Sequence, residues 1–94
     1  MSELSLDQPW VLSPSVALRP EPFGALAYHF GNRKLIFLKR PELVAVVRGL
    51  DAAADVRSAL VAAGIAEASW PSYVDALRGL AASDMIRSRH EVAA

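Results

Sequence analysis

The stretch from residue 25 to residue 38 constrains the fold most strongly, because it has the pattern of a β-hairpin. Residues 25–30 and residues 33–38 both have the composition of strands, and Gly31-Asn32 lies between them. This residue pair suits the positive φ angles of a tight two-residue turn. The sequence therefore predicts two antiparallel strands joined by a short connection.

A turn of two residues also fixes the register of the two strands, because a slip of one residue would exchange their faces. The predicted opposite pairs are Tyr28 with Leu35, Leu26 with Phe37, and Phe30 with Arg33. Most of these pairs bring aromatic and aliphatic side chains together on one face, which favours the hairpin.

The returning strand is apolar on both faces, which is unusual for an antiparallel strand. Leu35 and Phe37 lie on one face, while Ile36 and Leu38 lie on the other beside the small Ala25 and Ala27. An antiparallel sheet with one face in water normally has polar residues on that face. We therefore expect a helix, a neighbouring chain or a ligand to cover the second apolar face.

The segment before the hairpin predicts one more strand and an arm. Residues 15–19 alternate as a half-buried strand, and Pro20-Glu-Pro22 is expected to end it. Residues 1–12 contain no periodic pattern and are predicted to form a flexible N-terminal arm, although the large apolar Trp10 should dock on the fold.

After the hairpin the apolar period becomes helical. We predict one helix from Pro41 to Gly49, one capped by Asp55 and ending at Gly64, and one capped by Ser69. Three strands followed by three helices predict an α+β fold, with a three-stranded antiparallel sheet followed by a three-helix bundle. The 94-residue length suits one domain, predicted over residues 13–88 with a disordered tail over 89–94.

Composition excludes several classes of function. The chain has no Cys, so thiol catalysis and cysteine-ligated metals are excluded. His29 and His90 have no metal-site spacing, the carboxylates are scattered singly, and we predict no catalytic residue, metal or cofactor. The charges of ten basic and ten acidic residues cancel, so the net charge is zero. No apolar run is long enough to cross a membrane. The acidic start of the chain does not resemble a secretory signal, so a cytoplasmic location is expected.

The basic residues are nevertheless concentrated in one segment. Residues 33–48 contain five basic side chains and only Glu42 as an acidic one, a local net charge of +4. Lys and Arg on an edge strand can simply block aggregation. The alternative interpretation is that this edge attracts an acidic extended peptide.

The third predicted helix carries a stripe of small residues at helical spacing. Its members are Ser72, Ala76, Gly79 and Ser83. The stripe can be an indifferent solvent face, or it can let another backbone approach the helix closely. In the second case it would form a groove with the apolar strand, suited to a strand-like peptide.

Several short motifs resemble the PqqD-like family, the precursor-peptide recognition elements of ribosomally made, modified peptides, and within it the peptide chaperones of mycofactocin systems. These motifs are Leu12-Ser-Pro-Ser-Val16, Lys34-Leu-Ile-Phe-Leu38, Arg40-Pro-Glu-Leu-Val44, Arg48-Gly-Leu-Asp51 and the helical segment from Trp70 to Ile86. The resemblance implies a winged-helix-like fold and a non-catalytic function. The leader of a small precursor peptide would bind as a fourth strand and be presented to a radical S-adenosylmethionine (SAM) maturase.

Carried onto this chain, the resemblance implies a peptide-binding groove between the returning strand and the third helix. Its predicted residues are Lys34, Leu35, Ile36, Phe37, Leu38, Lys39, Tyr73, Ala76, Leu77, Leu80 and Ser83. We expect Ile36→Pro to remove an N–H group at the strand edge and to weaken peptide binding.

Two other classes of function remain open. A winged helix more often binds DNA, but Arg78 and Asp75 cancel on the third helix, as do Arg57 and Asp55 on the second. A recognition helix needs Arg or Lys for phosphates and base edges, so we predict neither nucleic acid nor a membrane as partner. The third class is a structural subunit that binds an enzyme without peptide.

Overall fold

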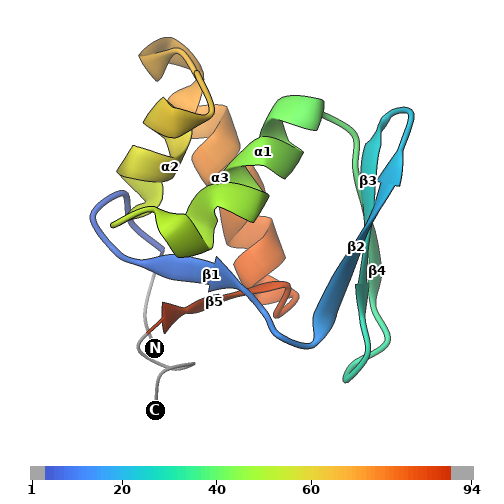
Figure 1. The fold of residues 1–94 in the computed structure, drawn as a ribbon. Helices are drawn as coiled ribbons and strands as arrows, with labels where there is room; N and C mark the ends of the chain where they lie inside the picture. Colours follow the sequence, from blue (N-terminus) through green and yellow to red (C-terminus); the bar gives the residue numbers. More distant parts are fainter. Residues whose placement is uncertain (1–3, 90–94) are drawn as a thin grey trace.

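The computed structural model describes residues 4–89, which form a small sheet packed beside a layer of helices (Figure 1). Residues 1–3 of the predicted arm, and the predicted tail from residue 90 onward, lie outside the described residues. The fold is α+β with a three-stranded antiparallel sheet and three α-helices, as predicted. Within residues 4–89, no helix is long and apolar enough to cross a membrane.

The sheet consists of β2 (Val16–Glu21), β3 (Gly24–His29) and β4 (Leu35–Leu38), in that spatial order. The predicted register is confirmed, since Tyr28 pairs with Leu35 and Leu26 pairs with Phe37. Gly24 is required where β3 begins, because a Cβ there would lie 2.1 Å from the carbonyl oxygen of Leu38. Its φ of +149° is also one that other residues rarely adopt.

The expectation that Pro20-Glu-Pro22 ends the first sheet strand is wrong, because β2 continues to Glu21 with Pro20 opposite Ala25. The bond from the Phe30 N–H to the Ser15 carbonyl sets the hydrogen-bonding alternation of this strand pair. By this alternation the nitrogen of Pro20 faces away from β3. Since β2 is an edge strand, Pro20 costs no bond in the sheet.

The predicted two-residue turn is also wrong, because the connection spans the four residues from Phe30 to Arg33. The His29 N–H donates to the Lys34 carbonyl at 3.0 Å, and the Arg33 N–H donates back to the His29 carbonyl at 2.8 Å. The positive φ falls at Arg33, at 62°, and at neither Gly31 nor Asn32. The longer turn adds one residue on each side of Gly31-Asn32, namely Phe30 and Arg33, so the two strands keep the predicted register.

The three helices are α1 (Pro41–Gly49), α2 (Val56–Ala62) and α3 (Trp70–Ala82), with short 3-10 turns η1 (Leu50–Ala52) and η2 (Glu67–Ser69). Pro41 and Gly49 bound α1 as predicted. The carboxylate of Asp55 caps α2 by accepting the Ser58 N–H at 2.8 Å, which lowers the pKa of Asp55. Ser69 precedes α3, but its side chain makes no capping bond.

A second, two-stranded sheet joins the two ends of the described chain. β1 (Trp10–Leu12) pairs antiparallel with β5 (Ile86–Ser88), and Trp10 is buried as expected. The side chain of Arg89 then bonds the carbonyls of Asp51, Ala53 and Ala54 beyond α1. Residues 10–12 therefore belong to the fold and not to the predicted flexible arm.

The helices cover only one face of the sheet. Ala25, Ala27 and Leu38 are fully buried on this inner face, and Ala27 and Leu38 belong to the same core cluster as Val46 of α1. The opposite face carries Leu35 and Phe37, which are 52% and 57% exposed. The apolar face of β4 that still needs a cover is therefore the face that carries Leu35 and Phe37, because nothing in residues 4–89 covers it.

Candidate functional site

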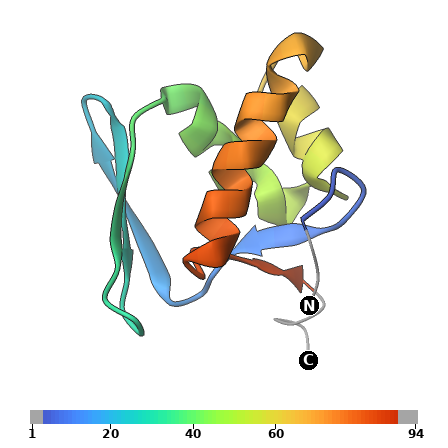
Figure 2. The ribbon, with the colours of Figure 1, turned by 180° about the vertical axis from the view of Figure 1, so that it is seen from behind.

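Strand β4 is an edge of the sheet, because within the described residues it pairs with β3 alone. Figure 2 shows β4 rising from the hairpin turn toward α1, while α3 descends in the opposite direction. The candidate site consists of this free edge and of the surface of α3 that side-chain contacts hold toward it.

The register determines which backbone groups of β4 are free. The bond from His29 to Lys34 fixes the alternation, so Lys34, Ile36 and Leu38 exchange their hydrogen bonds with β3. The N–H and C=O groups of Leu35 and Phe37 therefore point away from β3, toward the free edge. A new strand beside β4 would pair with these two residues.

This geometry corrects one sequence-based expectation. Ile36 lies opposite Ala27 in a hydrogen-bonded pair, so its N–H serves the β3–β4 ladder and is not available at the edge. Ile36→Pro would break the sheet itself, and Phe37 is the position at which proline removes an edge N–H.

Two contacts set the distance between β4 and α3 at opposite ends of the candidate site. At the hairpin end, the Asn32 side-chain amide donates to the Ser83 carbonyl at 3.2 Å. At the other end, the guanidinium of Arg40 lies 4.4 Å from the centre of the Tyr73 ring, which is a cation–π contact. Local sequence patterns do not reveal this role of Asn32 and Arg40, because their partners are more than 30 residues away.

The predicted site residues fall into three groups by burial. Lys34, Leu35, Phe37 and Lys39 are exposed, and Ile36, Ala76 and Ser83 are half-buried. Leu38, Tyr73, Leu77 and Leu80 are buried in the core. The buried leucines therefore belong to the core and not to the exposed surface of the candidate site.

The small-residue stripe of α3 lies outside the core. A Cβ added to Gly79 would meet no atom within 4 Å, so the helix surface is open at this point. Ser72 is exposed, and Ala76 is half-buried next to the buried Tyr73 and Leu77. This side of α3 is thus free to accept a closely approaching chain.

A polar cluster around the buried His29 anchors the hairpin end of the site. Nδ1 of His29 accepts the N–H groups of Gly31 and Asn32 at 2.9 and 3.1 Å. Its Nε2 must then carry the proton and donate to Asp84 at 2.8 Å. Arg87 binds the same carboxylate through two bonds.

The bonds from Arg87 are the main cause of a lowered pKa at Asp84, with a smaller contribution from His29. They hold the pKa of this carboxyl at about 2. Asp84 is therefore ionised at neutral pH and links the hairpin turn to the end of α3.

The described residues offer no metal site, since within 4–89 no three His, Cys, Asp or Glu side chains cluster suitably. His29 is used entirely by the turn and by Asp84. His90 lies outside the described residues.

Comparison with known proteins identifies close relatives. Residues 9–87 match the family model described as the peptide chaperone MftB family. A protein named peptide chaperone MftB from Mycobacterium tuberculosis (strain H37Rv) is 50% identical over 88 residues, covering 94% of this chain and 81% of that protein. A protein of the same name from Mycobacterium ulcerans (strain Agy99) is 54% identical over 80 residues, covering 85% and 73% of the two chains. No solved structure matches this chain.

Proposed function

The chain belongs to the peptide chaperone MftB family, and we propose that it binds the leader of a small ribosomal precursor peptide by β-strand addition and delivers it to a radical SAM maturase in mycofactocin biosynthesis. The family is named for chaperones and not for enzymes, which agrees with a non-catalytic role. Within this proposal the fold is a winged-helix-like, PqqD-like recognition element.

The observation that carries the proposal is the free edge of β4. The backbones of Leu35 and Phe37 leave two N–H and two C=O groups without a strand partner in residues 4–89. Strand addition at such an edge takes its affinity from main-chain hydrogen bonds. The family name and the free edge thus support the same mode of binding.

The dimensions of the site favour a short guest segment. Four residues of β4 extend for about 13 Å, and the ten residues of α3 from Tyr73 to Ala82 rise about 15 Å. A guest of four or five extended residues fits this length. Its side chains would alternate between the α3 side and the outer side of the sheet.

The charges of the edge favour an acidic leader. Lys34 and Lys39 are exposed at the two ends of β4, and neither makes an ion pair within the described chain. Basic groups at the rim of an interface mainly accelerate the encounter with an acidic partner. On α3, by contrast, Arg78 lies 3.8 Å from Asp75, which does not favour nucleic acid.

The experiment that tests the proposal is amide hydrogen exchange with and without the precursor leader. The amides of Leu35 and Phe37 should exchange at least tenfold more slowly in the complex, because they gain hydrogen bonds to the guest. The amide of Ile36 is an internal control, since it is already bonded to β3. Unchanged exchange at Leu35 and Phe37 under saturating leader would refute strand addition.

A further inference from the structure

The outer face of the sheet is the largest unexplained feature of the molecule. We define it as Leu26, Tyr28, Leu35 and Phe37, together with Phe23 and Phe30 in the adjoining turns. Five large apolar side chains are markedly exposed among the described residues, and four of them belong to this face. Val61 on α2 is the exception. Such a concentration on a small protein marks an interaction surface.

The aromatic rings of the outer face are arranged in two pairs. Phe23 and Phe37 meet edge to face with centroids 5.9 Å apart, and Tyr28 and Phe30 do so at 5.0 Å. The two pairs lie at opposite ends of the sheet, and within each pair one ring orients the other. A partner binding here would lose little side-chain entropy in ordering them.

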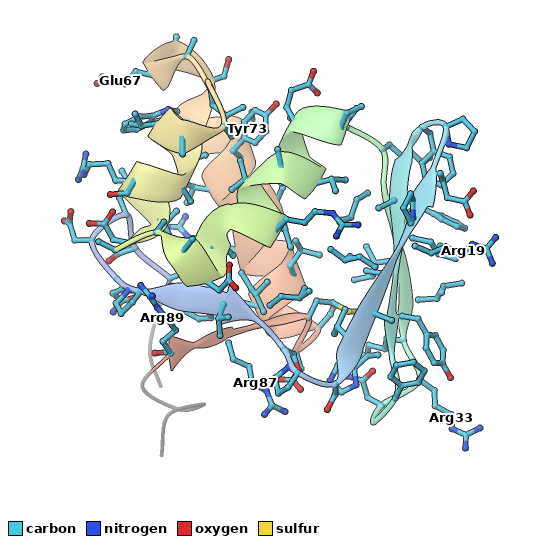
Figure 3. All side chains as sticks on the ribbon, viewed as in Figure 1. Arg19, Arg33, Glu67, Tyr73, Arg87 and Arg89 are labelled. Carbon is cyan, nitrogen blue, oxygen red and sulfur yellow. The ribbon has the colours of Figure 1, made fainter. Side chains whose placement is uncertain are left out.

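The charges around the outer face are predominantly positive. Figure 3 shows Arg19 and Arg33 on the side of the sheet that faces away from the helices. Lys39 lines a hollow of about 360 Å³ together with Phe23 and Phe37. Glu21 compensates only Arg19, at 2.8 Å. Two copies meeting through this face would bring like charges together, so the face favours a partner with carboxylates around an apolar patch.

We propose that the outer face is the docking surface for the maturase itself, a folded enzyme that presents an apolar patch edged by carboxylates. The proposal rests on the function proposed above. Phe23 and Phe30 distinguish this face from the peptide-binding edge, because they lie in turns and are not part of β4.

The two surfaces meet at Leu35 and Phe37. Their backbones form the free edge, and their side chains belong to the outer face. A guest strand beside β4 would therefore place alternate side chains on the same face, next to Phe37. The enzyme then contacts chaperone and guest together, so the leader should strengthen enzyme binding.

The test uses the full chain with Phe23 and Phe30 both replaced by serine, and Val61→Ser as the matched control. Calorimetry measures the affinity for the precursor leader and, separately, for the maturase with and without leader. In the double variant we expect leader binding within twofold of the unmodified protein and enzyme binding weakened at least tenfold. Val61→Ser should change neither.

Three results would overturn the proposal. The first is enzyme affinity that stays the same in the double variant. The second is self-association of the unmodified chain, seen by sedimentation and lost in the variant, which would make this face a contact between copies. The third is binding to anionic vesicles or single-stranded DNA that depends on Phe23 and Phe30. Failure of the unmodified chain to bind leader would instead refute the proposed function.

Discussion

Nε2 of His29 lies 2.8 Å from Oδ2 of Asp84, although 55 residues separate them in the sequence. This bond joins the hairpin turn to the end of α3, beside the contact from Asn32 to Ser83. Together with Arg40 over Tyr73, it sets the distance between strand and helix. The free edge of β4 is therefore positioned by contacts that do not involve the edge itself.

Replacing Asp84 by Asn should flatten the acid dependence of stability. The lowered pKa of Asp84, about 2 against an ordinary 3.8, means that its ionised form is favoured in the folded state. This stabilisation is fully present above about pH 4 and is lost as the pH falls toward 2. We expect the unmodified protein to lose about 1 kcal/mol more than the variant between pH 5 and pH 2, because the 42% exposed carboxylate is screened by water.

Urea denaturation at several pH values measures this effect. Asn keeps the backbone of residue 84, whose φ of 61° Asn tolerates well. Parallel stability curves for the two proteins down to pH 2 would show that the His29–Asp84–Arg87 cluster contributes nothing to the acid dependence of the free energy of unfolding.

Replacing Phe37 by Pro should separate peptide binding from folding. Proline removes an N–H that faces the free edge and leaves the β3–β4 ladder intact. We expect leader binding to fall at least tenfold below that of Phe37→Ser, which removes the same ring but keeps the N–H. Isothermal titration of both variants measures the difference.

Ile36→Pro is the contrasting variant, because its missing N–H belongs to the ladder with Ala27. It should lower the thermal midpoint far more than Phe37→Pro does, as followed by circular dichroism. Equal destabilisation by the two prolines would contradict the assignment of the free edge to Leu35 and Phe37.

Local patterns in the sequence were sufficient for the hairpin register and for the starts of α1 and α2. The alternation around Tyr28 and Leu35, the proline at residue 41 and the cap at Asp55 each act through near neighbours. The pairing of β1 with β5 could not be predicted in this way, because it joins two three-residue strands from opposite ends of the chain. Such pairing depends on tertiary packing around Trp10.

The length of the turn, and which apolar face of β4 is exposed, could not be predicted for a related reason. The turn length is set by the ring of His29, which holds the N–H groups of Gly31 and Asn32. The sequence shows that β4 is apolar on both faces, but only the packed helices decide that Ile36 faces inward and Phe37 outward.

Filling the open side of α3 should block the guest without harming the fold. Gly79 has no neighbour within 4 Å of an added Cβ, so Gly79→Ala should stabilise the helix by about 0.5–1 kcal/mol and leave leader binding nearly unchanged. Gly79→Leu should be equally well folded but bind leader at least tenfold more weakly. Titration and thermal denaturation of both variants test this, and full binding by Gly79→Leu would exclude this side of α3 from the site.

Reversing the charges at the ends of β4 should slow association with an acidic leader. Lys34→Glu with Lys39→Glu removes the attraction before contact, so the association rate should fall about tenfold at low salt and its salt dependence should weaken. The matched control is Arg48→Glu with Arg78→Glu, which changes the net charge equally at exposed helical positions. Stopped-flow fluorescence over a range of salt concentrations measures the rates. If both double variants slow association equally, overall charge accounts for the effect; if neither does, Lys34 and Lys39 only protect the edge from aggregation.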